Sequence, residues 1–130
     1  MKIKTIDIPA AGTWARDCEL ISLIYDIKIG FVLTYHKDTD DTYWSLKCEL
    51  SPAYKVVGEE FARVGYLENL PMEGGFFEII NSPWINELAQ FESNIPKDCK
   101  HYVLQFYDET VEILAARFIF EQLDEKPVLN

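Results

Sequence analysis

Alternating apolar and polar residues mark the middle of the chain as a pair of β-strands. Every second residue from Ile29 to Tyr35 is apolar, and the same alternation runs from Trp44 to Leu50. A period of two places one face of each strand in a core and the other in water. The intervening segment 37–41, Lys-Asp-Thr-Asp-Asp, favours a turn, because short polar side chains bond to nearby backbone. The pattern predicts an antiparallel hairpin.

Weaker signals predict further strands on both sides of this hairpin. Residues 2–8 are typical of an opening strand that ends before Pro9 and Gly12. Residues 13–25 fit either a helical or a strand period, and a strand is favoured from about Cys18 because β-branched and aromatic residues dominate its end. Residues 53–57 can add a short strand. Residues 58–75 are predicted to form a loop around the segment 71–75.

Helix signals occur together in one later segment. Ser82 stands at the cap position, Pro83 follows at the first helical position, and an apolar stripe runs from Trp84 to Phe91. Serine accepts a hydrogen bond from a free amide of the first turn, and proline lacks an amide that the first turn would leave unbonded anyway. The sequence predicts a helix over about 82–93.

The last part of the chain predicts a second strand pair, 99–107 and 110–120, turning at Asp108 and Glu109. A two-residue loop would place Phe106 opposite Val111 and Gln105 opposite Glu112. Asp-Glu lacks the glycine that such tight turns prefer, so a longer loop is equally compatible with the sequence.

Together these elements predict one domain over residues 1–130. Apolar residues make up 48% of the chain and aromatic residues 14%, which is enough apolar surface for one aromatic-rich core. The predicted class is α+β, a mainly antiparallel sheet of hairpins with one late helix. A flattened β-barrel or a sandwich with one helix is the alternative.

The charge balance limits the partners that the protein can have. The chain holds 22 acidic and 12 basic residues, for a net charge of −10, and most of the excess lies in its second half. Phosphates require basic patches, so nucleic acid is disfavoured and a basic protein is favoured. No segment approaches the length of apolar chain that crosses a membrane, and no signal-length apolar run follows the first residues. We therefore expect a cytoplasmic protein that does not bind membranes.

Candidate chemistry is sparse along the chain. The three cysteines, Cys18, Cys48 and Cys99, are widely spaced, and buried reduced thiols are expected. His36 and His101 belong to no metal-ligand motif. Serine lies in no nucleophile elbow, and the Gly74–Gly75 pair is followed by strand-like residues where a phosphate loop needs lysine and a helix.

Carboxylates also favour a non-catalytic reading. The Asp38, Asp40 and Asp41 cluster resembles the start of a calcium loop, but the glycine and the final glutamate of that loop are missing, so a solvated turn is favoured. Asp108, Glu109 and Glu112 could pair as acid and base, yet exposed positions are expected for them. We predict no catalytic residue, no metal site and no cofactor.

We predict instead a partner-facing surface built from acidic loop positions and an aromatic anchor. Its predicted residues are Asp38, Asp40, Asp41, Glu68, Glu73, Phe76 and Glu109. An exposed aromatic residue among carboxylates, such as Tyr66, Phe76 or Phe77, would supply the desolvated contact, while complementary charge would speed association. Core packing is the competing interpretation for these three aromatic residues.

Residues 76–118 resemble small bacterial immunity-type proteins of polymorphic toxin systems. Ser82-Pro83-Trp84-Ile85-Asn86-Glu87-Leu88 matches their SxW(I/L)xEL helix, and the segment from His101 to Ala115 matches their HYxxxxxDxxxExxA strand pair. The resemblance implies a cytosolic antidote that occludes a toxin by direct binding, without catalysis or cofactor. The matching motifs are mostly structural, so the resemblance assigns no functional residue.

Two other classes of function remain open. A small-ligand-binding module or minor enzyme would gather His36, Tyr35 or Glu112 in a pocket of a curved sheet. A structural subunit would present a large apolar face to a second copy. The expected oligomeric state is a monomer or a weak homodimer.

Overall fold

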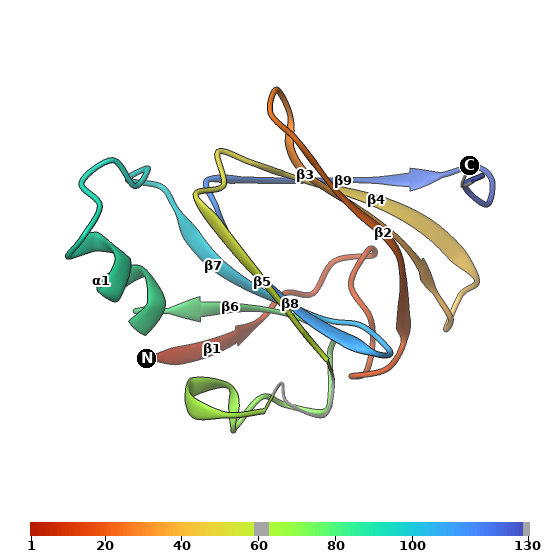
Figure 1. Ribbon diagram of the computed structural model, residues 1–130. Coiled ribbons are helices and arrows are strands. Elements are labelled where there is room, and N and C mark those ends of the chain that lie inside the picture. Colours follow the sequence, from red (N-terminus) through yellow and green to blue (C-terminus); the bar gives the residue numbers. More distant parts are fainter. Residues whose placement is uncertain (59–62, 129–130) are drawn as a thin grey trace.

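The computed structural model describes residues 1–58 and 63–128, and it arranges their strands in two antiparallel sheets (Figure 1). The five-stranded sheet has the order β1 (Lys2–Thr5), β6 (Phe76–Ile80), β7 (Lys100–Gln105), β8 (Glu109–Ala115), β5 (Ala53–Gly58). The four-stranded sheet has the order β2 (Cys18–Asp26), β3 (Gly30–Lys37), β4 (Thr42–Glu49), β9 (Arg117–Leu123). One α-helix, α1 (Pro83–Ala89), lies between β6 and β7 in the described chain.

The main core lies between the inner faces of the two sheets and is rich in aromatic rings. Tyr35 of β3 is fully buried, with its ring edge-on to Phe76 and Phe106 at centroid distances of 5.7 and 5.4 Å. Its hydroxyl donates to the carbonyl of Ala10 at 2.8 Å, so the buried polar group is paired. The aromatic-rich core predicted from composition is confirmed.

A second apolar layer covers the outer face of the five-stranded sheet. Phe77, Ile79 and Val103 point to this side and are buried beneath Leu67 and Leu70. These two leucines belong to the segment around a short 3-10 helix, η2 (Gly65–Leu67), and α1 packs beside them against β7. Both faces of the five-stranded sheet are therefore occupied.

The outer face of the four-stranded sheet, here called the open face, remains partly accessible. Along β3 and β4 buried and half-buried residues alternate strictly, as a sheet covered on one side requires. The half-buried positions form this face: Val32, Thr34, His36, Tyr43, Ser45, Lys47, Glu49. The two sheets thus differ in how many of their faces are packed.

Most predicted elements are confirmed, some with shorter bounds. The hairpin of β3 and β4, the strand from Cys18 and the short β5 all form. The opening strand was predicted to residue 8 but ends at Thr5, before the chain turns towards Pro9. The helix was predicted to residue 93 but ends at Ala89, and the chain continues in turns in which the amides of Phe91 and Glu92 donate to the Leu88 carbonyl. The strand β6 was not predicted. Residues 59–62 of the predicted loop lie outside the described residues.

The predicted strand over 110–120 is wrong in one respect. The chain leaves the five-stranded sheet after Ala115 and enters the four-stranded sheet at Arg117, so one apolar run supplies two strands. Of the two turn lengths that the sequence left open for the last hairpin, the longer one forms: Leu104 pairs with Val111, and Val103 rather than Gln105 faces Glu112. A longer turn, closed by a bond from the Phe106 amide to the Glu109 carbonyl at 2.8 Å, shifts the register by two and leaves each residue on its predicted face.

The predicted class is confirmed at the level of a mainly antiparallel α+β fold with one α-helix in the described chain. The two stacked sheets also agree with the sandwich that was part of the alternative prediction. Among the described residues no helix is both long and apolar enough to cross a bilayer.

Candidate functional site

One end of the two-sheet stack gathers loops from distant parts of the sequence. The β3–β4 turn, the β7–β8 turn and the segment from residue 13 to the start of β2 meet there (Figure 1). The amide of Asp38 donates to the carbonyl of Asp17 at 2.8 Å, and the amide of Tyr107 donates to the carbonyl of Cys18 at 2.7 Å. We call this region the acidic end.

A buried carboxylate holds the acidic end together. Asp17 has no exposed surface, and its oxygens accept from the amide and hydroxyl of Thr13 at 2.9 and 3.0 Å and from the amide of Thr39 at 2.8 Å. Burial by itself raises the pKa of Asp17, but the hydrogen bonds from Thr13 and Thr39 outweigh it and lower the pKa. The ionised side chain therefore fixes the β3–β4 turn against the preceding loop.

The predicted aspartates stand on this turn around His36. His36 Nδ1 lies 2.9 Å from Asp38 Oδ1, and His36 Nε2 lies 2.6 Å from Asp41 Oδ1. Glu19 of the neighbouring strand faces His36 in the β2–β3 register. Asp41 has a φ of 53°, a left-handed conformation that aspartate tolerates in turns. The carboxylates are thus presented at fixed positions on an exposed turn.

Two exposed aromatic rings lie among these carboxylates. Trp14 is 47% exposed and forms a β-bridge with Glu73, while Tyr107 is 43% exposed and adjoins Asp108. The guanidinium carbon of Arg16 lies 4.2 Å from the centroid of the Tyr107 ring, which orients that ring. Large aromatic side chains held in place at a charged surface are typical of contact hot spots.

The β7–β8 turn adds further negative charge. The pKa of Glu109 is raised, first by partial burial and then by repulsion from Asp108 and Glu19. Carboxylates of β2 and of the β7–β8 turn are thus close enough for Glu19 to contribute to the raised pKa of Glu109. Such a field attracts a cationic partner.

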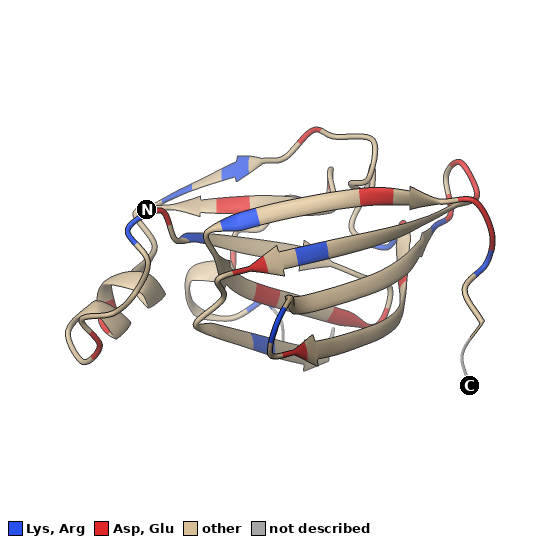
Figure 2. Cartoon of the chain, turned by 90° about the horizontal axis from the view of Figure 1, so that it is seen from above, with Lys and Arg blue, Asp and Glu red and all other residues tan. Residues whose placement is uncertain are grey.

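Charges on the sheets are balanced by cross-strand neighbours. Lys4 faces Glu78, Lys55 faces Glu112 and Arg117 faces Glu49 in the strand registers. Opposite charges in facing positions stabilise a sheet modestly and cancel at a distance. Figure 2 shows this mixture of blue and red along the strands, whereas red predominates at the end that carries the β3–β4 turn and from which the chain continues to its C-terminus.

Five of the seven predicted partner-facing residues lie together, and the other two, Glu68 and Phe76, lie elsewhere. Asp38, Asp40, Asp41, Glu73 and Glu109 come together at the acidic end through the contacts described above. Glu68 is exposed but follows η2, on the layer that covers the five-stranded sheet.

The predicted aromatic anchor is wrong. Phe76 and Phe77 are fully buried, because β6 is a central strand with packed layers on both sides. Tyr66 is half-buried in a hydrogen-bond network. Trp14 and Tyr107 occupy the positions that these residues were predicted to fill, and no local sequence signal distinguishes them from core aromatics.

A second polar cluster, here called the buried network, lies under α1 on the outer face of the five-stranded sheet. His101 Nδ1 lies 2.6 Å from Ser82 Oγ, and His101 Nε2 lies 2.7 Å from Glu112 Oε1. The Tyr66 hydroxyl donates to the same carboxylate oxygen at 2.5 Å. Burial raises the pKa of Glu112, but the hydrogen bonds from His101 and Tyr66 and the nearby positive charge lower it overall.

The buried network contains the residue types and the hydrogen bonds of a nucleophilic triad, but its hydroxyl is not accessible to a substrate. Ser82 Oγ accepts the Ile85 amide at 3.1 Å and caps α1, and the same oxygen shares a hydrogen bond with His101 Nδ1. Ser82 is 4% exposed and His101 is fully buried, so a substrate carbonyl has no approach to the hydroxyl. The network therefore stabilises the packing of α1 and η2 on the sheet.

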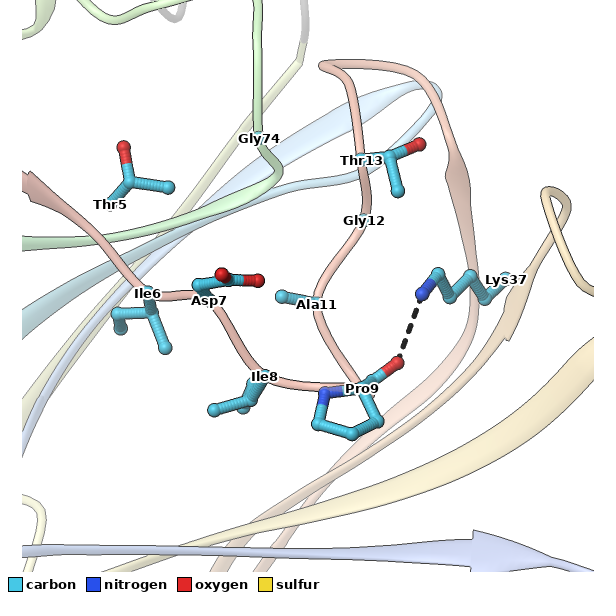
Figure 3. Close-up of a pocket in the computed structure, with 10 residues that line it drawn as sticks. All are labelled: Thr5, Ile6, Asp7, Ile8, Pro9, Ala11, Gly12, Thr13, Lys37 and Gly74. Carbon is cyan, nitrogen blue, oxygen red and sulfur yellow. Dashed lines mark hydrogen bonds between the residues drawn. The ribbon is translucent and has the colours of Figure 1, made fainter.

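The residues of the predicted ligand pocket do not meet. His36 lies on the open face, Tyr35 lies in the main core and Glu112 lies in the buried network. A separate open hollow of about 690 Å³ lies beside residues 5–13, with Lys37 and Gly74 at its wall (Figure 3). The Lys37 ammonium there donates to the Pro9 carbonyl at 3.0 Å and lies 3.6 Å from Asp40, so its charge is used within the protein.

Within residues 1–58 and 63–128, no group of three or more His, Cys, Asp or Glu side chains is placed to hold a metal ion. Burial raises the pKa of Cys18 and of Cys48 to about 12, so neither thiol is activated as a nucleophile. Comparisons of the chain with protein-family models, with curated proteins and with solved structures find no match. The functional interpretation therefore depends on the geometry of the acidic end.

Proposed function

We propose that this protein acts by binding a basic protein partner through its acidic end, without catalysis. The observation that supports this most strongly is the fixed placement of carboxylates from three separate segments around the exposed rings of Trp14 and Tyr107. Charge gives rapid and specific encounter, and the two rings provide apolar area that can be desolvated on contact.

The partner class that we propose is a toxin domain, which would make the protein a cytoplasmic immunity protein. The resemblance of residues 76–118 to immunity-type proteins supports this class, and so does the strongly negative charge of −10. A nuclease toxin needs a basic surface to hold nucleic acid, and an acidic end could occupy that surface. The antidote works in this case by occlusion alone.

Coexpression with the product of the neighbouring gene tests this proposal. We expect the neighbour to be toxic by itself and harmless when this protein is present. Variants Trp14→Ala and Tyr107→Ala should lose protection, whereas Phe91→Ala, which truncates a ring that is 82% exposed elsewhere, should retain it. Protection that survives both substitutions, or a neighbour that is never toxic, would contradict the proposal.

Salt dependence provides a second test once a partner is in hand. Association through the acidic end should slow as the ionic strength rises from about 0.05 to about 0.5 M, because the Debye length then falls from above roughly 10 Å to below roughly 5 Å. The dissociation rate should change less, because the aromatic contacts are not screened. An association rate that is independent of salt would exclude electrostatic recognition.

A homodimer is the second candidate function, and an apolar surface at the opposite end of the stack favours it. Ile27 at the β2–β3 turn is 86% exposed, and Tyr25, Leu50 and Tyr54 are exposed nearby. Contiguous apolar surface of this kind is typical of contact sites. Sedimentation of the wild type and of Ile27→Asp at micromolar concentrations tests it: only a wild-type dimer that the substitution dissociates supports this candidate.

A further inference from the structure

Lys55 places its ammonium group over the ring face of Trp84 and beside the hydroxyl group of Tyr66. It projects from β5, an edge strand of the five-stranded sheet, and its Nζ lies 4.0 Å from the centroid of the Trp84 ring. The same atom lies 5.7 Å from the centroid of Tyr66 and donates a hydrogen bond to the Tyr66 hydroxyl at 3.3 Å. The faces of aromatic rings attract cations because their π-electrons are negative.

A carboxylate lies behind these rings. Glu112 faces Lys55 in the β5–β8 register and accepts the Tyr66 hydroxyl at 2.5 Å. Glu112 is nearly buried, so its negative charge is poorly screened by water. We call Trp84, Tyr66 and Glu112 together the cation cage.

The cation cage is preorganised by the buried network. The Trp84 and Tyr66 rings both stand edge-on to His101, at centroid distances of 5.3 and 5.5 Å. Trp84 belongs to α1, which Ser82 caps, and Tyr66 belongs to η2. The rings and the carboxylate therefore keep their positions when the occupant between them changes.

Lys55, which occupies the cation cage in this structure, is the residue that can move out of it. Lys55 is an exposed residue with a long flexible stem, whereas Trp84 and Glu112 are buried. A hollow of about 300 Å³ adjoins the site, lined by Lys55 and Tyr66 together with Val64 and Leu67. This hollow has room for the substituents of a larger cation.

We propose that the cation cage is a binding site for alkylammonium ions, with Lys55 as an internal occupant that the ligand displaces. A quaternary ammonium group fits this chemistry best, because it is weakly hydrated and spreads its charge over methyl groups that can contact the Trp84 ring face and the Tyr66 hydroxyl oxygen. The site is separate from the acidic end and does not depend on the proposed function.

Titration with tetramethylammonium chloride tests the cage directly, using sodium chloride at equal ionic strength as the blank. The readout is the indole N–H signal of Trp84 in two-dimensional NMR spectra, with the signals of Trp14 and Trp44 as internal references. In Lys55→Ala we expect saturable binding at Trp84 with a dissociation constant on the order of 10 mM or tighter. The wild type should bind at least about tenfold more weakly, because Lys55 competes.

Three further variants make the result decisive. Lys55→Gln should bind as Lys55→Ala does, and Lys28→Ala, which removes an exposed lysine of the β2–β3 turn, should behave as the wild type. Trp84→Leu combined with Lys55→Ala should abolish binding, which the backbone amide signal of Tyr66 reports in this variant and in Lys55→Ala alike. The proposal is overturned if Lys55→Ala and Lys55→Gln show no saturable change at Trp84, or if the wild type binds as tightly as they do.

Discussion

The two sheets of this protein differ in how their strands meet solvent, and the difference separates the sheet that is packed on both faces from the sheet that leaves one face accessible. In the five-stranded sheet β8 is buried at every position after its first, whereas in the four-stranded sheet β3 alternates between buried and half-buried residues. Packing on both faces fixes the first sheet, and its polar residues are consumed by internal hydrogen bonds. The second sheet leaves one face and the acidic end available to a partner.

The largest expected effect of a substitution lies in the five-stranded sheet. Glu112→Ala leaves the hydrogen-bond donors of His101 and Tyr66 unpaired under α1, so we expect a loss of about 3–5 kcal/mol in the free energy of unfolding. Urea denaturation measures it. Glu121→Ala on exposed β9 is the control and should change stability by less than about 0.5 kcal/mol. Equal losses in the two variants would contradict the distinction between the sheets.

Two valine substitutions compare the stability contributed by the packed outer face of the five-stranded sheet with that contributed by the open face. Val103 on β7 and Val32 on β3 both point away from the main core, but only Val103 is fully buried. Both valines lose the same strand preference on substitution, so we expect about 2 kcal/mol for Val103→Ala and less than about 1 kcal/mol for Val32→Ala. Chemical denaturation of the two variants gives the difference. A larger loss for Val32→Ala would mean that the open face is packed.

Removal of the helix cap should have a smaller effect. Ser82→Ala deletes the acceptor for the Ile85 amide and the partner of His101, and we expect a loss of about 1–2 kcal/mol. Ser82→Thr retains a hydroxyl and serves as the control. Partner binding through the acidic end should be unchanged by Ser82→Ala, which isothermal titration can measure. A loss of binding without a loss of stability would give Ser82 a functional role.

The smallest expected effect is a change with pH in the stability difference between the wild type and a Glu112 variant. Because the pKa of Glu112 is lowered in the folded protein from an ordinary value of 4.5, its ionised form adds stability above about pH 4.5, and this contribution is lost as the pH falls through the lower folded value. We therefore expect the stability gap between the wild type and Glu112→Gln to be constant near pH 7 and to shrink below pH 4.5. Thermal unfolding at several pH values measures the gap. A stability gap that grows as the pH falls would contradict the lowered pKa of Glu112 in the folded protein.

The sequence predicted the period of the β3–β4 hairpin more completely than it predicted the burial of the five-stranded sheet, for a physical reason. A strand packed on one face shows its period directly, which is how the hairpin from Ile29 to Leu50 was found. A strand packed on both faces has no such alternation, so the polar residues His101 and Glu112 gave no sign that they would be buried together.

Features that depend on contacts between distant residues were also not predictable from the sequence. The run from Thr110 to Phe120 is continuously strand-like, and only the positions of β4 and β7 decide that it divides at Ala116. The acidic residues of the β3–β4 turn were predicted because turns carry short polar side chains. The neighbours that complete the acidic end, Trp14 and Tyr107, required the folded chain, since loop contacts bring them there.

The division of this run between two sheets also affects how the molecule folds. β9 pairs with β4, a strand from the first half of the chain, while β8 pairs with its close neighbour β7. Closing so long a loop costs chain entropy before any contact compensates it, and folds with many distant pairings reach the native state slowly. The docking of β9 should therefore limit the refolding rate, and a chain shortened after Ala116 should leave β4 as an unpaired edge prone to self-association.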